Sequence, residues 1–230
     1  MSIRAITSGI FAIEGLKMGR AYLVEDAAGL TLIDTSSPSA SEGILAAIAE
    51  VGRRPQDLHT IVGTHYHYDH VGNVAVLVER TGARFCVHEA DVEYVEGRTP
   101  WRAVTTPVVG ATMTRMAPAQ ESLKVDRVLR DGDVVEAAGG LEVVHAPGHT
   151  PGHIALYARE RETVFSGDAF MNVAGLQLPA SASTHDMTQA KASIRRLSEL
   201  RFEYALPGHG VPVLSRASEK LGEWARRWLL

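Results

Sequence analysis

Cysteine is almost absent from this sequence, because its 230 residues include only Cys86. A single cysteine excludes an internal disulfide framework and agrees with a reducing compartment. Long apolar runs are also missing, since no stretch approaches the roughly 20 residues that span a bilayer. Residues 1–15 lack the basic and apolar segments of a signal peptide. We therefore expect a cytoplasmic protein that does not associate with a membrane.

An excess of either charge is missing as well. The chain has 23 Lys and Arg against 27 Asp and Glu, a net charge of -4, and its basic residues are scattered. Without a basic patch we expect no nucleic-acid partner, and a small-molecule substrate is the natural default. The 45% of hydrophobic residues suffices for a sizeable core. We predict one domain over residues 1–230 with two similar halves, about 1–115 and 116–230, and the sequence carries no indication of oligomeric state.

Short β-like runs alternate with amphipathic helical segments along the chain. Apolar residues at helical spacing predict helices over 44–51, over 71–78 with an end at Gly82, from Asp186 onward with Gln189 in its first turn, and over 221–228. The β-like runs are 21–24, 30–33, 59–63, 127–129, 141–145, 154–158, 163–166 and 204–206. This alternation predicts an α/β fold in which two sheets pack face to face with helices outside.

Three histidines and an aspartate are crowded into residues 64–70, directly after an apolar strand. Such a density of imidazoles has no packing rationale, whereas imidazole nitrogen and carboxylate oxygen are ligands shared by zinc, iron and manganese. Three further candidates also follow predicted strands: His149, Asp168 and His209. Since loops at the carboxyl ends of strands gather chemistry in layered α/β folds, the pattern predicts a metal site.

These motifs, in this order, resemble those of the metallo-β-lactamase superfamily. The resemblance runs from Asp34 to His209 and includes the Pro147-Gly-His-Thr-Pro-Gly-His153 run. It implies a four-layer αββα sandwich with a dinuclear metal site at one edge of the sheets. By matching position, three residues would hold a first metal, three would hold a second, and one would bridge both. They are, in that order, His65, His67 and His149; Asp69, His70 and His209; and Asp168.

The matched position of Asp34 implies support of the ligands from behind, although a turn-capping role fits the sequence equally well. We expect two divalent ions, zinc first, with manganese or iron as alternatives. Metal coordination lowers the pKa of a bridging water toward ~7. We therefore predict attack of hydroxide on an ester, lactone or thioester-type small molecule, with Asp69 as the catalytic group that orients the nucleophile or returns a proton.

Departures from the family pattern indicate which branch of the superfamily this sequence resembles. Two-zinc β-lactamases of the family generally carry a cysteine where Asp168 stands, so the resemblance is to the glyoxalase II-like and lactonase-like branch and not to a dedicated β-lactamase. Lactonases usually show a tyrosine shortly after that aspartate, and here Ala169 and Phe170 follow. Phosphodiester or promiscuous β-lactam hydrolysis stays an alternative. Two other classes also stay open: a mononuclear-iron oxidoreductase like the persulfide dioxygenases, and a noncatalytic metal-binding module.

Five residues are candidates for substrate contact because they lie in or near the predicted pocket loops: Tyr66, Tyr68, Trp101, Phe170 and His185. Residues 93–125 fit neither half of the repeated pattern. A lid over the site and ordinary core packing both explain that segment.

Overall fold

Two mixed β-sheets face each other in the computed structural model, which describes residues 2–100 and 122–229. The first sheet follows chain order: β1 (Ser2–Thr7), β2 (Ile10–Glu14), β3 (Tyr22–Asp26), β4 (Gly29–Ile33), β5 (Leu58–Val62), β6 (Arg84–His88) and β7 (Arg127–Leu129). The second has the order β14-β11-β10-β9-β8, formed by β8 (Val134–Val135), β9 (Leu141–His145), β10 (Ile154–Ala158), β11 (Thr163–Gly167) and β14 (Tyr204–Pro207). A separate short ribbon pairs β12 (Met171–Asn172) with β13 (Leu176–Gln177).

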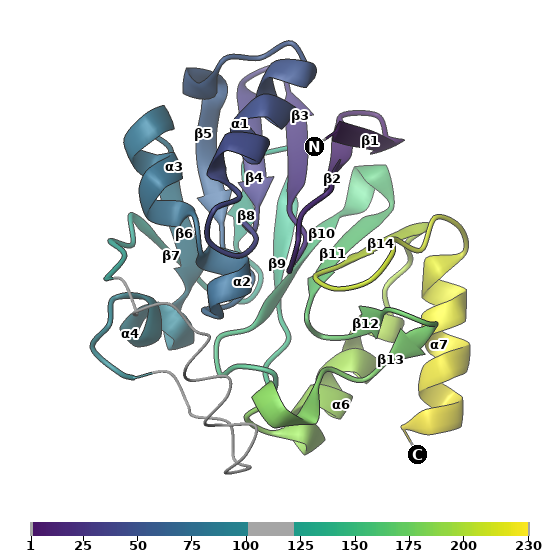
Figure 1. Cartoon of the computed structure of the whole chain (residues 1–230). Coiled ribbons are helices and arrows are strands. Elements are labelled where there is room, and N and C mark those ends of the chain that lie inside the picture. The colour runs from purple at the N-terminus through teal and green to yellow at the C-terminus, as the bar shows by residue number, and fades with distance from the viewer. Residues whose placement is uncertain (1, 101–121, 230) are drawn as a thin grey trace.

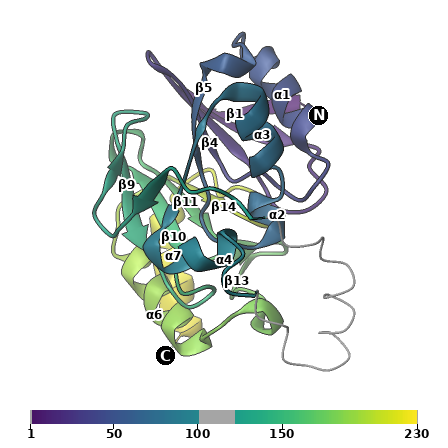
Figure 2. The same cartoon turned by 90° about the vertical axis from the view of Figure 1, so that its left-hand side faces the viewer.

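Helices cover the outer faces of both sheets (Figures 1 and 2). On the first sheet lie α1 (Ser41–Glu50) and α3 (Val74–Thr81), and on the second lie α6 (Met187–Ser198) and α7 (Ala217–Trp228). Two single-turn helices, α2 (Tyr68–Val71) and α4 (Val92–Val95), belong to loops. Within the described ranges, none of the helices combines the length and the apolar composition needed to cross a bilayer.

Three apolar clusters fill the three spaces between these four layers. Neighbouring residues of one strand enter different clusters, because side chains of a strand alternate between its two faces. Leu32 packs with Ile44 of α1, while the next residue, Ile33, packs between the sheets. In the second sheet Phe165 faces the first sheet, and Val164 packs toward α6 and α7. The predicted αββα sandwich is therefore confirmed.

One helix differs from its prediction. The apolar spacing of residues 71–78 predicts a continuous helix, whereas the structure has α2 and α3 with a break at Gly72 and Asn73. The buried Asn73 side chain explains the break, because its oxygen accepts hydrogen bonds from the Ala40 and Ser41 amides. Its amide group donates to the Thr35 carbonyl in return. Asn73 thus ties this segment to the loop after β4.

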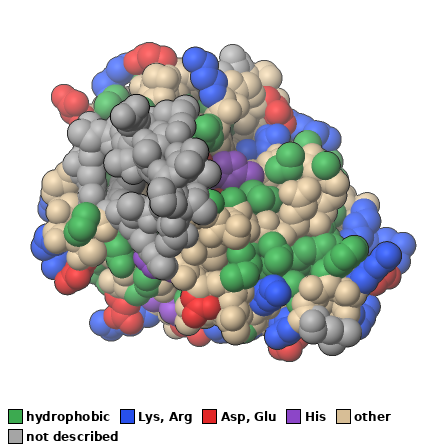
Figure 3. Space-filling view, turned by 60° about the horizontal axis from the view of Figure 1, so that its bottom comes forward, with side chains coloured by type: hydrophobic (Ala, Val, Ile, Leu, Met, Phe, Trp, Pro, Cys, Tyr) green, Lys and Arg blue, Asp and Glu red, His purple; other side chains and the backbone are tan. Residues whose placement is uncertain are grey.

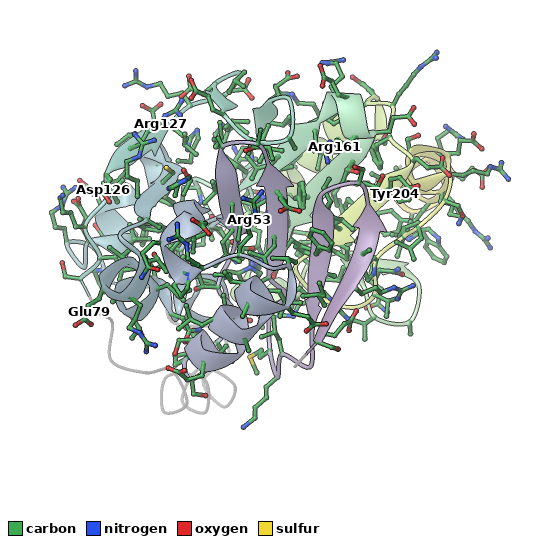
Figure 4. The ribbon with its side chains drawn as sticks, turned by 90° about the horizontal axis from the view of Figure 1, so that it is seen from above. Arg53, Glu79, Asp126, Arg127, Arg161 and Tyr204 are labelled. Atoms are coloured by element: carbon green, nitrogen blue, oxygen red, sulfur yellow. The ribbon has the colours of Figure 1, made fainter. Side chains whose placement is uncertain are left out.

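The two ends of the sandwich differ in chemistry. Strands β4, β5, β6 and β7 are parallel, so their carboxyl ends share one edge, where α2 lies (Figure 1). The other end is seen in Figure 4, where Arg53, Asp126 and Arg127 are labelled. Arg53 pairs there with Glu25 at 2.7 Å. The predicted metal ligands all belong to the first of these two ends.

Candidate metal centre

The loops that follow six strands meet at one edge of the sandwich. In the first sheet they follow the parallel strands β4, β5 and β6. In the second sheet they follow β9, β11 and β14, because β9 and β11 are both antiparallel to β10, and β14 is parallel to β11. Every residue predicted as a metal ligand lies in one of these loops.

A first donor group consists of His65, His67 and His149, whose candidate ligand atoms lie within 4.8 Å of one another. The Thr64 hydroxyl donates to Asp34 at 2.8 Å, so it accepts from Nδ1 of His65 at 3.0 Å. That bond leaves Nε2 of His65 as a bare acceptor, fully buried. Nδ1 of His67 lies 3.0 Å from Nε2 of His149. Three imidazole nitrogens therefore converge on one point.

A second donor group consists of Asp69, His70 and His209. Nδ1 of His70 donates to Oδ2 of Asp34 at 2.7 Å, which turns Nε2 toward Nε2 of His209, 3.4 Å away. The same His209 nitrogen lies 3.2 Å from Oδ2 of Asp69. This group offers two imidazole nitrogens and a carboxylate oxygen.

The carboxylate of Asp168 lies between the two groups. Its Oδ1 is 3.5 Å from Nε2 of His70, and its Oδ2 is 3.4 Å from His149 and 3.3 Å from His209. The Asp168 amide donates to Nε2 of His153, whose Nδ1 donates to the Ala146 carbonyl. His153 therefore holds the backbone of Asp168 and stands outside both donor groups.

Asp34 lies behind the ligands and supports them. Its carboxylate accepts from the Thr64 amide at 2.7 Å, in addition to the Thr64 hydroxyl and His70. The residue has a φ of 58°, a turn conformation that aspartate tolerates better than most side chains. The structure thus places Asp34 both in a turn and against two residues of the ligand loop.

Burial sets the charge of the first group. It lowers the pKa of His65 and His149 well below the usual histidine value, with neighbouring histidines adding to the effect. It also lowers the pKa of His67 to about 4. All three imidazoles are therefore neutral at pH 7, the form that binds a cation.

The two histidines of the second group are protonated in the metal-free chain at pH 7. Burial alone would lower the pKa of His70, but the Asp168 and Asp34 carboxylates raise it to about 9. Hydrogen bonds to Asp168 and Asp69 likewise outweigh burial and raise the pKa of His209 to about 10. The carboxyl of Asp168 has its pKa lowered by these same histidines against its own burial. A cation entering here would displace protons.

The donor spacing fits divalent ions. A four-coordinate ion about 2.1 Å from each ligand keeps neighbouring donor atoms about 3.4 Å apart. Three separations within the groups, and three from Asp168 to their histidines, run from 3.0 to 3.5 Å. Among the described residues, the buried Nε2 of His65 and Oδ1 of Asp168 have no hydrogen-bond partner. Such orphaned atoms are costly unless an ion satisfies them.

The candidate substrate contacts divide by exposure. Tyr66 and Phe170 are fully buried and present no surface to a ligand in this structure, and Phe170 belongs to the core under α6 and α7. The Tyr66 hydroxyl contacts Nε2 of His185 at 2.7 Å, and His185 keeps partial exposure, as does Tyr68. Trp101 lies outside the described residues, as does most of the 93–125 segment. Histidine side chains reach the surface among apolar ones on this face (Figure 3).

Comparisons with known proteins find a matching family model and several relatives. A model of the Metallo-beta-lactamase superfamily matches residues 15–209. Human acyl-coenzyme A thioesterase MBLAC2 is 31% identical over 180 residues, 74% of this chain and 62% of the relative. A hydroxyacylglutathione hydrolase of Synechococcus sp. is 32% identical over 162 residues, 69% of this chain and 52% of the relative. The chain thus spans about half to two thirds of the length of these curated relatives.

A solved structure shares the fold and considerable sequence. The crystal structure of TTHA1623 in a di-iron-bound form is 33% identical, with a TM-score of 0.67 over 86% of this chain and 90% of that one.

Proposed function

Because the chain belongs to the metallo-β-lactamase superfamily, we propose that it is a metal-dependent hydrolase that cleaves an ester, lactone or thioester bond in a small molecule. One observation carries the proposal: seven side chains with metal-binding chemistry converge on one edge, and among the described residues two of their buried donor atoms have no hydrogen-bond partner. A noncatalytic metal-binding module would bind metal at the same donors without turnover of any substrate.

The two donor groups would hold two divalent ions, with Asp168 between them. His65, His67 and His149 suit one ion, and Asp69, His70 and His209 suit the other. Bound divalent ions would supply a water of lowered pKa and polarise the bond to be cleaved. We expect zinc, and the di-iron form of the relative TTHA1623 makes iron the alternative to test.

Asp69 is the group we assign to proton handling. Its side chain is 13% exposed, and a hydrogen bond from His209 outweighs burial and lowers its pKa. The carboxylate is therefore ionised at neutral pH, at the rim of the site. In that state it orients an attacking water through a hydrogen bond and carries its proton toward the leaving group.

A thioester is the first substrate class to test, because both curated relatives named above act, by their names, on acyl-coenzyme A or hydroxyacylglutathione. We assign Tyr68 and His185 as substrate contacts, since both are partly exposed and both adjoin the ligand loops. The His185 amide donates to the carbonyl of His149, which fixes its loop against the first donor group.

The test is turnover of a substrate panel by freshly purified protein, before and after treatment with a chelator. The panel holds an acyl-coenzyme A, a glutathione thioester, an aryl ester, a lactone, a phosphodiester and nitrocefin. We expect chelator-sensitive cleavage of an acyl compound and none by Asp168→Ala. Cleavage of only the phosphodiester or only nitrocefin would show that the substrate is a phosphodiester or a β-lactam and not an acyl compound. One iron per chain, with oxygen consumption on a persulfide and no hydrolysis, would replace the hydrolase by an oxidoreductase.

A further inference from the structure

Asp91 follows β6 at the same edge of the first sheet, and its side chain is completely buried. Its carboxylate reaches loops of both sheets. Oδ2 accepts from the Tyr66 amide at 3.1 Å and from the Thr150 hydroxyl at 2.8 Å, and Oδ1 accepts from the Gly152 amide at 2.7 Å. One carboxylate therefore joins the loop after β5 to the loop after β9.

These three bonds lie next to the first donor group. Tyr66 separates His65 from His67, and Thr150 directly follows His149. A shift of Asp91 would therefore move the imidazoles of one loop relative to the imidazole of the other. The approach is close, because a Cβ on Gly152 would lie 2.6 Å from Cγ of Asp91.

The burial of this carboxylate needs an explanation. Transfer of a charged group from water into the interior is costly unless hydrogen bonds compensate for it. Burial raises the pKa of Asp91, to about 7, although its three hydrogen bonds act in the opposite direction. The bonds end on two amides and a hydroxyl that belong to the ligand loops. Fixing the distance between these loops accounts for the position of the carboxylate.

We propose that Asp91 is a positioning residue, which holds His65 and His67 at the correct separation from His149 so that these three imidazoles bind one metal ion. The inference rests on the proposed function, since it presumes that the first donor group holds metal. It extends that function to a residue whose three hydrogen bonds end on neighbours of the ligands, Tyr66, Thr150 and Gly152.

The decisive variant is Asp91→Asn, which keeps the shape and removes one acceptor. Whichever way the amide is turned, its NH₂ faces the N–H of Tyr66 or of Gly152, and two donors cannot bond. Zinc affinity is measured by competition with a chromophoric chelator at pH 8 in two backgrounds. His209→Ala leaves the first donor group complete, and His149→Ala leaves the second complete.

We expect Asp91→Asn to weaken zinc binding by about tenfold or more in the His209→Ala background, the range seen when groups that orient metal ligands are lost. In the His149→Ala background we expect little change. Asp26→Asn is the matched control, because Asp26 also accepts from three amides, those of Ala28, Gly29 and Ala138. Asp26 lies at the opposite end of β4 from the site, about 17 Å away along the strand. Asp26→Asn should therefore leave the zinc affinity unchanged in both backgrounds.

Thr150→Val and Thr150→Ser provide a second route if Asp91→Asn does not fold. The valine variant removes one hydrogen bond to Asp91, and the serine variant keeps it, so only the first should weaken zinc binding. Equal loss in both backgrounds, or no loss in either, would overturn the role of Asp91 while leaving the proposed function intact. Absence of zinc binding by the unmutated chain would overturn the proposed function and this inference with it.

Discussion

Gly208 offers a strict test of how tightly the site is built. A Cβ at this position would lie 2.3 Å from Oδ1 of Asp168 and 2.6 Å from Cε1 of His70. Real Cβ atoms essentially never approach another atom below 3.0 Å, so in Gly208→Ala the carboxylate must withdraw by 3.0 − 2.3, about 0.7 Å. The carboxylate cannot withdraw freely, because the Asp168 amide is held by His153 and its oxygens face three histidines.

A displacement of this size should be expensive for catalysis. Misplacement of a reacting group by about 1 Å can cost on the order of 100-fold in rate, which corresponds to about 2.7 kcal/mol of activation free energy. We expect kcat/KM of Gly208→Ala to fall by about that factor on the best substrate of the panel. Metal content, measured by elemental analysis on the same sample, should fall as well.

Gly222→Ala is the matched control. Gly222 lies within α7, and its nearest neighbour for a new Cβ is the end of the flexible Arg226 side chain at 3.4 Å. A helical Gly→Ala change at a compatible site stabilises a protein by about 0.4–1 kcal/mol, so activity should be unchanged and Tm equal or higher. Unaltered activity and metal content in Gly208→Ala would show that Asp168 can move by this distance without loss of function.

Three further predictions concern the carboxylates and histidines of the site. Asp168→Ala should lose metal and turnover together, because this carboxylate faces both donor groups. Full activity with bound metal would show that Asp168 does not bridge two metal ions. Asp34→Asn should weaken binding of the second ion by about 10-fold to 100-fold, since His70 loses its charged acceptor, and an unchanged affinity in a chelator competition would contradict this. In the metal-free chain the pKa values of His70 and His209, about 9 and about 10, exceed an unfolded value of ~6.5. Their stabilisation is therefore complete below about pH 6.5 and is lost as the pH rises through 9 and 10, so the urea midpoint should be lower at pH 10 than at pH 7, and an equal or higher midpoint would be inconsistent.

The layers and eight of the described strands could be predicted from the sequence because their signals are local, whereas β1, β2, β6, β8, β12 and β13 were not predicted. Strands β9 and β10 have the predicted bounds, and α6 begins after Asp186, whose side chain accepts from the Gln189 amide as expected. The break between α2 and α3 could not be predicted, because it depends on hydrogen bonds that Asn73 accepts from a loop more than 30 residues earlier. Apolar spacing carries no information about such a partner.

The ligand set lies together in space because its members share one sequence feature, a position after a strand. Asp91 also follows a strand, β6, but residues 84–88 are not among the predicted β-like runs, so the sequence did not single it out. Its role depends on the Tyr66 and Thr150 loops from both sheets, and their approach is visible only in the folded chain. The burial of Phe170 could not be predicted either, since a residue near a ligand in the sequence can face either the pocket or the core.

We propose that the converging donors make this chain a hydrolase that needs two metal ions. The most direct measurement strips the protein with a chelator and titrates zinc back while turnover of a thioester is followed. We expect no turnover in the stripped protein, and recovery that saturates at about two ions per chain, one for each donor group. Full turnover in the stripped protein would show that the reaction needs no metal, and zinc binding at both groups without any hydrolysis across the panel would show that the chain is not a hydrolase of these bonds.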